Sequence, residues 1–294
     1  YMTGAITLLS GVNLLIDEGA ELVFAFDRDL YPNVVTRWEG LDIINYQPCI
    51  YAYGQKNIGL TGKGIINGNG SNERWWYMKG NKHHGYHEGV DEWQGTDKIG
   101  TRAQLLKMAD NAVPVEKRVF GKGKGLRPQL VNFVKCENAI IEGVELRDSP
   151  FWVIHPLFVK NLTVRDVKIY NEGPNGDGCD PESCEDVLIE GCTFHTGDDC
   201  LALKSGRTAD GLRANVPCKN IIIRGCKMAD GHGGVVIGSE ISGGCSNIFA
   251  EDCDMDSPNL DRVVRIKTNT CRGGINENIY VRNIRVGECR EAVM

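Results

Sequence analysis

The sequence predicts an all-β fold, a right-handed parallel β-helix in which one chain winds into a stack of coils. Three observations support this fold class. Short segments rich in Ile and Val recur along the chain and begin after an Asn or Asp, and cysteines recur at fixed positions within the repeat. Helical periodicity is largely missing. Strand-length pieces separated by Gly and Asn turns are typical of a solenoid whose coils bury their inward faces by stacking.

The polar residue at the start of each segment marks the repeat. From Asn138 to the equivalent Asn161 is 23 residues, and from Asp186 to Asn220 is 34. Parallel strands of stacked coils lie about 4.8 Å apart, so like residues align in columns. A β-sandwich also has turn-linked alternating strands, but it does not predict such columns. The positions that start a repeat are Asn57, Asn138, Asn161, Asp186, Asn220, Asn247 and Asn278.

The cysteines follow the same columns. Of the 12 cysteines, one set lies two residues before the Asn or Asp of a repeat and another lies six residues after it. Cysteine is a small residue that is often buried, so this placement favours a buried ladder of thiols. A disulfide framework is the alternative that the sequence leaves open. The first set is Cys136, Cys184, Cys218 and Cys245, and the second is Cys192, Cys226 and Cys253.

Composition limits the class of protein. The 294 residues, 41% of them hydrophobic, are enough for a single domain over 1–294 with a substantial core. A formal net charge of −6 argues against a general nucleic-acid binder, and no apolar run reaches the about 18 residues of a transmembrane helix. The chain begins without Met or a signal peptide and starts and stops near apolar patterns, so we expect it to be incomplete at both ends.

The stretch 71–128 interrupts the repeat. It is rich in aromatic residues and histidine, and it contains a candidate helix over 101–111. Long excursions from a rigid scaffold often wall a binding site, so we expect this one to flank a groove. Its tryptophans suit either sugar stacking or a small aromatic core that holds the excursion together. Its histidines, His83, His84 and His87, lack the Cys or acidic partners of a typical metal site, and no metal is expected.

Charged residues occur in turns about one coil apart. Asp177 is followed after 21 residues by Asp198-Asp199, Asp198 after 34 by His232, and His232 after 33 by Arg265. In a stack of coils such steps align the groups on one face. Cleaving a glycosidic bond uses one protonated carboxyl at the leaving oxygen and a second carboxylate that acts on water or on the sugar. Clustered Asp side chains cannot all ionise cheaply, so one pKa is expected to rise and to mark the acid.

The cations fit the same interpretation. Arg265 and Lys267 alternate across one apolar residue and therefore share a face, where they suit a carboxylate of the substrate. His232 could tune the protonation of the acid. Each of these elements alone also fits a plain turn or a solvated strand face. The pair Asp198-Asp199 is the hardest to explain structurally, because adjacent carboxylates repel each other and suit strands poorly.

At these motifs the chain resembles the polygalacturonase family of glycoside hydrolases, and the resemblance extends over nearly its whole length. The family shows Asn-x-Asp, Gly/Gln-Asp-Asp, Gly-His-Gly and Arg-x-Lys in this order. The resemblance implies a right-handed parallel β-helix that hydrolyses α-1,4-galacturonosyl linkages of pectin with inversion, without metal or cofactor, in a secreted or periplasmic enzyme. The matching segments are Asn175-Gly176-Asp177, Gly197-Asp198-Asp199, Gly231-His232-Gly233 and Arg265-Ile266-Lys267.

The resemblance implies catalytic roles for four residues. Asp198 is similar to the general acid, and Asp177 and Asp199 are similar to the pair that activates water. His232 is similar to the groove histidine that supports the acid. Because Asp198 and Asp199 are neighbours, a regular strand would send them to opposite faces. Both reach a groove only if the backbone bends there, and Gly197 is the candidate for that bend.

The resemblance also implies contacts with substrate. Arg265 and Lys267 are similar to the clamp on the galacturonate carboxylate, and Asn175 and His155 are expected to be polar contacts of the groove. The usual Thr of the first motif is Gly176 in this chain. The later groove Tyr of the family has no clear counterpart, so one subsite is expected to be incomplete.

Other functions on the same scaffold are the alternatives. The cations favour a galacturonate near the cut, against a rhamnogalacturonan hydrolase. A calcium-dependent lyase needs acidic ligands, which Asp177, Asp180, Asp198 and Asp199 could mimic, and a non-catalytic β-helix has no reason to gather these carboxylates. Endo and exo cleavage both remain open, and the excursion at 71–128 favours exo cleavage. The expected partner is a pectic polysaccharide or an oligogalacturonide, with no nucleic acid or membrane, and the expected state is a monomer.

Overall fold

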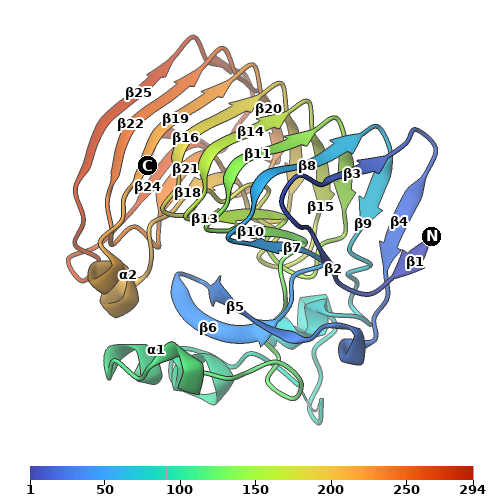
Figure 1. Cartoon of the computed structure of the whole chain (residues 1–294). Coiled ribbons are helices and arrows are strands. Elements are labelled where there is room, and N and C mark those ends of the chain that lie inside the picture. The colour runs from blue at the N-terminus through green and yellow to red at the C-terminus, as the bar shows by residue number, and fades with distance from the viewer. Residues whose placement is uncertain (91, 294) are drawn as a thin grey trace.

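The chain winds into a right-handed parallel β-helix, as the repeat predicts (Figure 1). A computed structural model describes residues 1–90 and 92–293. Within these residues the strands form three sheet faces that run along the stack of coils, and every pairing between coils is parallel. In this part of the chain, no helix is long and apolar enough to cross a membrane.

The first and second faces run the length of the stack. The first face consists of β1 (Met2–Thr3), β4 (Glu21–Phe24), β9 (Ile65–Asn67), β12 (Glu145–Arg147), β15 (Lys168–Asn171), β17 (Thr193–Thr196), β20 (Lys227–Asp230), β23 (Asp254–Met255) and β26 (Arg285–Val286). The second face consists of β3 (Asn13–Ile16), β8 (Lys56–Gly62), β11 (Glu137–Glu142), β14 (Lys160–Arg165), β16 (Glu185–Glu190), β19 (Cys218–Arg224), β22 (Cys245–Glu251) and β25 (Asn276–Arg282).

The third face has two halves. Bridges from Cys179 to Ile154 on one side and to Leu201 on the other join them. The N-terminal half consists of β2 (Ile6–Thr7), β7 (Ile50–Tyr53), β10 (Val131–Val134) and β13 (Ile154–Leu157). The C-terminal half consists of β18 (Asp199–Leu203), β21 (Gly233–Gly238), β24 (Arg262–Lys267) and β27 (Glu291–Val293).

The repeated Asn and Asp residues form a ladder along one edge of the second face. Asn161 Nδ2 donates a hydrogen bond to Asn138 Oδ1 at 2.8 Å, and Asn220 Nδ2 donates to Asp186 Oδ1 at 2.9 Å. These residues have φ between 57° and 59°, a left-handed conformation that Asn and Asp tolerate better than other side chains. The periodic polar residue seen in the sequence therefore bends the backbone near the start of the strands of the second face from β8 to β25.

The core fills the inside of the stack. In neighbouring coils Ile141, Val164, Ile189 and Ile223 lie in register and are 0% exposed. Burial of one such side chain stabilises the fold by about 1.5–3 kcal/mol. Each coil lacks a complete core of its own, so this stabilisation comes from stacking.

All 12 cysteines lie within the described residues and are free thiols, so the ladder interpretation is confirmed and the disulfide alternative is wrong. Cys218 and Cys245 are in register on adjacent coils. Several thiols donate weak hydrogen bonds to carbonyls of the coils, such as Cys184 Sγ to Pro156 O at 3.2 Å. They act as small core residues that also satisfy backbone acceptors.

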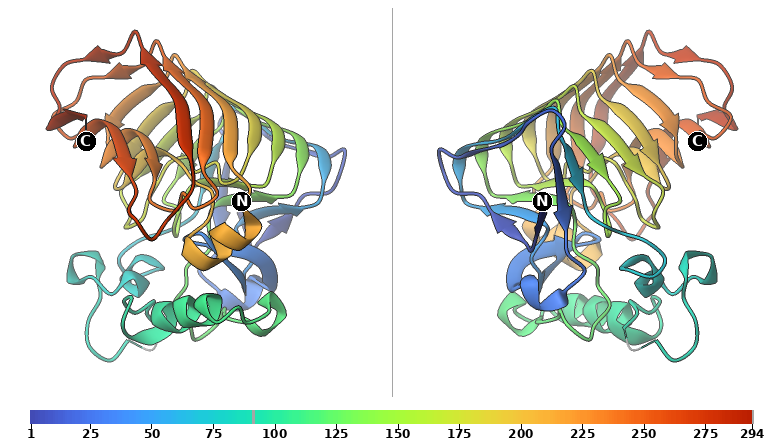
Figure 2. Two further views of the ribbon diagram at one scale, coloured as in Figure 1. Left: turned by 90° about the vertical axis from the view of Figure 1, so that its left-hand side faces the viewer. Right: turned by 90° about the vertical axis from the view of Figure 1, so that its right-hand side faces the viewer.

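An antiparallel hairpin of β5 (Asn33–Trp38) and β6 (Leu41–Tyr46) leaves the stack, and the sequence did not predict it. It packs with the excursion, whose helix α1 (Gly100–Asp110) agrees with the predicted helix over 101–111. Figure 2 shows both on one side of the stack, near the short helix α2 (Thr208–Ala214). The 3-10 helices are η1 (Arg28–Leu30), η2 (Trp76–Lys79), η3 (Lys82–His84) and η4 (Val115–Lys117).

Trp75 of the excursion packs into the core of the stack. The Trp75 ring is 0% exposed, and its centroid lies 5.1 Å from Phe26, 5.4 Å from Tyr31 and 5.9 Å from Tyr46. Trp76 Nε1 donates to Ser149 O at 2.9 Å and so anchors the excursion to the stack. Trp75 is therefore buried and does not serve sugar stacking, and its ring partners lie outside the excursion, in the core that it shares with the stack.

Candidate active site

Turns and strand starts at the C-terminal half of the third face carry the charged motifs. Asp177 lies in the turn after β15, Asp198 lies just before β18, and Asp199 is the first residue of that strand. His232 immediately precedes β21. The one-coil spacing thus brings these groups to the same end of adjacent strands, because β18 and β21 pair with Asp199 opposite Gly233.

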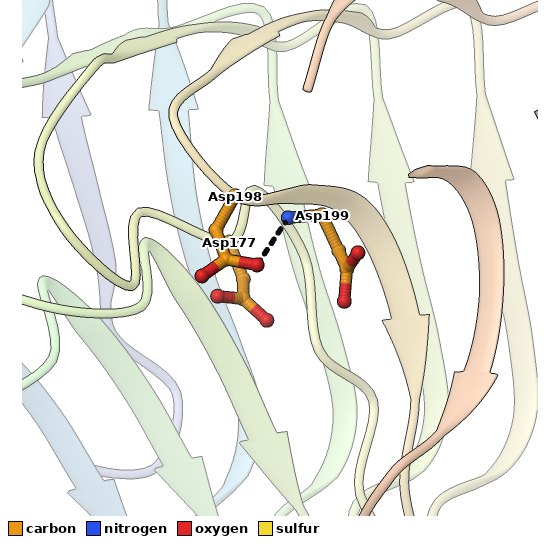
Figure 3. A group of neighbouring side chains, drawn as sticks. All are labelled: Asp177, Asp198 and Asp199. Carbon is orange, nitrogen blue, oxygen red and sulfur yellow. Dashed lines mark hydrogen bonds between the residues drawn. The ribbon is translucent and has the colours of Figure 1, made fainter. Parts of the chain in front are cut away.

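The three aspartates form one cluster. One carboxylate oxygen from each lies within 4.8 Å of the others, and Figure 3 shows the three side chains together. Asp198 sits in the turn and not in the strand, so both neighbours reach the cluster, and the Asp199 N–H donates to Asp198 Oδ1 at 3.0 Å. Gly197 permits the tight turn, because a Cβ there would lie 2.5 Å from Glu172 O.

Cations neutralise this cluster. His232 Nδ1 lies 3.1 Å from Asp198 Oδ1. Lys267 Nζ donates to Asp199 Oδ2, and an Arg265 nitrogen lies 3.9 Å from Asp199 Oδ1. The two residues predicted to form the clamp thus lie beside Asp199.

The sequence analysis did not identify a buried lysine that lies next to the cluster. Lys204 Nζ lies 3.5 Å from Asp177 Oδ2 and 3.2 Å from Glu240 Oε2, and it sits 4.5 Å from the Trp152 ring centroid. Its pKa is held well above the usual value, because carboxylates including Asp180 outweigh the effect of burial. The signal available in the sequence was a lysine that ends an otherwise apolar strand, which is costly unless the charge is paired.

The carboxyl groups differ in proton affinity. Burial, and then the charge of Asp198, raises the pKa of Asp177 to about 8. Burial also raises the pKa of Asp199, against the opposing effect of Lys267. Burial acts to raise the pKa of Asp198 too, but the hydrogen bond and charge of His232 leave it below the usual value. The hydrogen bond to Asp198 in turn raises the pKa of His232.

This order differs from the expectation that the group with the raised pKa is the acid. The cluster does hold carboxyls with a raised pKa, but they are Asp177 and Asp199 and not Asp198. The physical reason is access: the Asp177 side chain is 5% exposed, whereas that of Asp198 is 22% exposed and pairs with a half-exposed His232. Below the cluster, Asp180 is fully buried, and burial followed by the charge of Asp177 raises its pKa.

Asn175 is held by a second residue that the sequence analysis missed. Arg127 is 0% exposed and donates to Asn175 Oδ1 at 2.8 Å, to Pro174 O at 2.7 Å and to Pro150 O at 2.9 Å. Arg127 lies near the end of the excursion and also donates to Gln94 Oε1 at 3.3 Å. It therefore ties the excursion to the turn that carries Asp177.

Part of this site lines a pocket of about 270 Å³, whereas Asp199, His232 and Arg265 are not among the lining residues. Residues of the stack form one part of its wall, and the hairpin and the excursion contribute the rest. The lining residues from the stack are Trp152, Asn175, Asp177, Asp198, Lys204, Ser239, Glu240 and Lys267, and those from the hairpin and excursion are Glu39, Lys79 and Arg102.

His155 does not reach the pocket, so the expectation that it contacts substrate is wrong for this structure. It is 0% exposed, and its Nε2 lies 2.8 Å from Glu182 Oε2. Its Nδ1 faces the amides of Gln129 and Asn132, each at 3.2 Å. The hairpin covers the N-terminal half of the third face, where His155 lies. No repeat in the sequence predicts this hairpin.

The excursion histidines show no metal-binding geometry. Among the described residues, the cluster of Asp177, Asp198 and Asp199 is the grouping whose ligand atoms are close enough to hold a metal ion, and His83, His84 and His87 form no such grouping.

Comparisons with known proteins identify the family of this chain. A sequence model described as glycosyl hydrolases family 28 matches residues 116–294. A probable polygalacturonase of Vitis vinifera is 36% identical over 56% of this chain and 34% of its own length. An exo-poly-alpha-D-galacturonosidase of Dickeya chrysanthemi is 25% identical over 96% of this chain and 48% of its own length. The chain thus spans half or less of these two relatives.

Solved structures extend the likeness to the whole chain. The hyperthermoactive exopolygalacturonase of Thermotoga maritima is 40% identical with a TM-score of 0.90, over 99% of this chain and 69% of that one. The family 28 exopolygalacturonase of Yersinia enterocolitica shares the fold, with a TM-score of 0.74 at 23% identity. With a family match over more than half of its residues, this chain belongs to glycosyl hydrolases family 28.

Proposed function

We propose that the protein hydrolyses α-1,4-galacturonosyl linkages of polygalacturonate, acting on chain ends of the polysaccharide or on oligogalacturonides. The observation that carries this proposal is the cluster of three carboxylates beside Arg265 and Lys267. Asp177, Asp198 and Lys267 of this group line one pocket. Carboxylates supply the acid and base of glycoside hydrolysis, and the cations suit the carboxylate of each galacturonate unit. Because the substrate is a polymer, the proposal also implies a secreted or periplasmic enzyme.

Asp198 is the general acid in this proposal. Its side chain is the most exposed of the three and faces the pocket, where it can reach a glycosidic oxygen. Against the effect of burial, His232 holds the pKa of Asp198 low. Substrate excludes water and brings its own carboxylate near, and both effects raise the pKa of an adjacent carboxyl. The proton that Asp177 carries in the free site then becomes available to Asp198.

Asp177 and Asp199 activate the water. Lys204 and Lys267 hold them from below and from the side. The water oxygen attacks the anomeric carbon and gives its proton to this pair, while the leaving oxygen takes the proton of Asp198 as the glycosidic bond breaks. The products are a free sugar and a shortened chain, and one proton has moved from the acid to the base pair.

The stereochemical course is a separate proposal. The family resemblance implies inversion, but inverting enzymes usually hold their carboxyls about 6.5–9.5 Å apart and retaining ones about 5–5.5 Å apart. The oxygens of this cluster lie within 4.8 Å, which favours retention by that general rule. We propose inversion, with the water bound beside the cluster. Proton NMR of the first anomer released tests it: an initial β-anomer supports inversion, and an initial α-anomer overturns it.

The pocket supports exo cleavage. Glu39, Lys79 and Arg102 from the hairpin and excursion contribute to its wall, so a long polymer has less room to pass than in an open groove. Viscometry of polygalacturonate during release of reducing sugar tests this. An exo enzyme releases sugar with little early loss of viscosity, and a steep early loss would overturn exo in favour of endo cleavage. If polygalacturonate releases nothing, rhamnogalacturonan is the substrate to test.

A further inference from the structure

One lysine of the pocket has no partner among the residues that the structure describes. Lys79 lines the pocket together with Asp198 and Lys267, and its ammonium makes no hydrogen bond or ion pair with any described residue. Burial lowers the pKa of Lys79, and the nearby Glu39 opposes that effect. An amine that is partly withdrawn from water and left unpaired gains more from a bound anion than an exposed one does.

The other cations of the pocket wall are already paired. Arg102 bonds Glu39 at 2.7 Å, Lys204 lies 3.2 Å from Glu240, and Lys267 bonds Asp199. An incoming carboxylate must compete with a protein carboxylate at each of these. Within the part of the chain that the structure describes, Lys79 is the lining cation at which no such competition occurs.

The scaffold holds Lys79 in place. It ends η2, which follows the fully buried Trp75 and contains Trp76, whose ring N–H is bonded to Ser149 O. Lys79 also lies outside residues 116–294, which match the family model. The motifs that this chain shares with its family therefore do not supply this cation; the excursion does.

We propose that Lys79 binds the carboxylate of the end unit of a galacturonan chain and so makes the pocket specific for an acidic chain end. The proposal rests on the proposed function and adds a specificity-determining residue to it. A pocket of about 270 Å³ is near the lower end of ligand sites, which span roughly 300–1,000 Å³, and so suits one sugar unit more than a polymer segment. Arg265 and Lys267 then hold the unit on the other side of the cut.

The test compares three trisaccharides: trigalacturonate and its two analogues that carry a methyl ester on one end unit. Wild type should have a KM at least about tenfold higher for one of the two esters, the loss expected for one charge-assisted contact. Lys79→Met should raise the KM for trigalacturonate to that same level, abolish the discrimination against that ester and change kcat far less. Lys79→Arg should restore most of the discrimination.

Lys82→Met is the matched control, because Lys82 is an exposed lysine of the same excursion that does not line the pocket. It should keep the wild-type discrimination. If wild type is active but Lys79→Met keeps the discrimination, or if wild type discriminates against neither ester, the role of Lys79 is overturned and the hydrolase proposal stands. If wild type cleaves none of the three substrates and releases nothing from polygalacturonate, the proposed function itself is overturned.

Discussion

The two halves of the third face share one fold but differ in what lies over them. In the N-terminal half, His155 and Asn132 are paired in register and are fully buried under the hairpin. In the C-terminal half, Arg265 and Lys267 point outward from the equivalent strand and remain partly exposed. The coils are alike, so the difference comes from the cover and not from the strands.

In the N-terminal half, which the hairpin covers, the charged residues form buried pairs that have a structural role. Arg37 of the hairpin is 0% exposed, pairs with Glu182 at 2.9 Å and lies 4.7 Å from the Phe158 ring centroid. Glu182 also binds His155. In the open half the charges are paired as well, but they border a pocket. Polar residues on the outward face of a β-helix are thus structural or functional according to whether an insertion covers them.

The largest expected effect on activity comes from a residue of the pocket, and it can be compared with a substitution in the coil scaffold. Asp198→Asn should lower kcat for galacturonate release by about 10²–10⁴-fold, because the acid can no longer donate its proton. Asp186→Asn is the matched control, since Asp186 occupies a ladder position that is Asn in other coils. That variant should keep both activity and stability. Full activity of Asp198→Asn would contradict the assignment of the acid.

Sequence patterns predicted the coils well because register is periodic. A residue such as Asn220 must adopt left-handed φ in every coil, and inward residues such as Ile223 must be apolar, so both leave a repeating signal. The hairpin at 33–46 has no such signal. Its position is set by non-periodic contacts, such as that of Arg37 with Glu182, which lie far apart in the chain.

The site was predicted in part for the same reason. Asp177, Asp198 and His232 recur at one-coil steps, and the structure brings them together. Lys204 and the pKa order were not predicted, because both depend on burial by neighbouring coils and insertions. The repeat predicts which residues share a face of the β-helix. Which of these residues are buried depends on how coils and insertions pack against them.

Removing the buried ion pair between the hairpin and the stack should lower the stability of the fold. Arg37→Met leaves Glu182 buried without its cation and should lower the free energy of unfolding by about 3–5 kcal/mol, measured by urea unfolding. Arg147→Met removes a cation from a partly exposed pair with Glu145, and should cost about 1 kcal/mol or less. Equal losses in the two variants would mean that the buried pair does not hold the hairpin.

Weakening the open clamp should affect binding more than folding. Arg265→Gln should raise KM for oligogalacturonate roughly tenfold, because a charged partner of the substrate carboxylate is lost. Arg282→Gln on the second face removes an exposed arginine paired with Glu251 and should leave KM unchanged. An unchanged KM in Arg265→Gln would remove this residue from the substrate clamp.

The stability of the fold should depend on pH in opposite directions through Asp177 and through Glu182. The pKa of Asp177 is raised to about 8, chiefly by burial, so its contribution to stability is full below about pH 4 and is lost as the pH rises through about 8. Despite burial, Arg37 holds the pKa of Glu182 low, so its contribution is lost as the pH falls. On the alkaline side, the free energy of unfolding of wild type, measured with urea, should fall as the pH rises. Asp177→Asn should make that fall less steep by up to about 1.4 kcal/mol per pH unit. Parallel curves for the variant and wild type would contradict the raised pKa.

The smallest effect, no change, is expected from a chelator. The three aspartates are close enough for a metal ion, but Lys204 and Lys267 already neutralise two of them, and a divalent cation would have to bind beside these ammonium groups. Excess chelator should leave sugar release intact, with no ultraviolet absorbance from an unsaturated product. Loss of activity on chelation, restored by calcium and accompanied by that absorbance, would mean that the open half of the face is a lyase site and that the lysines serve to position an ion.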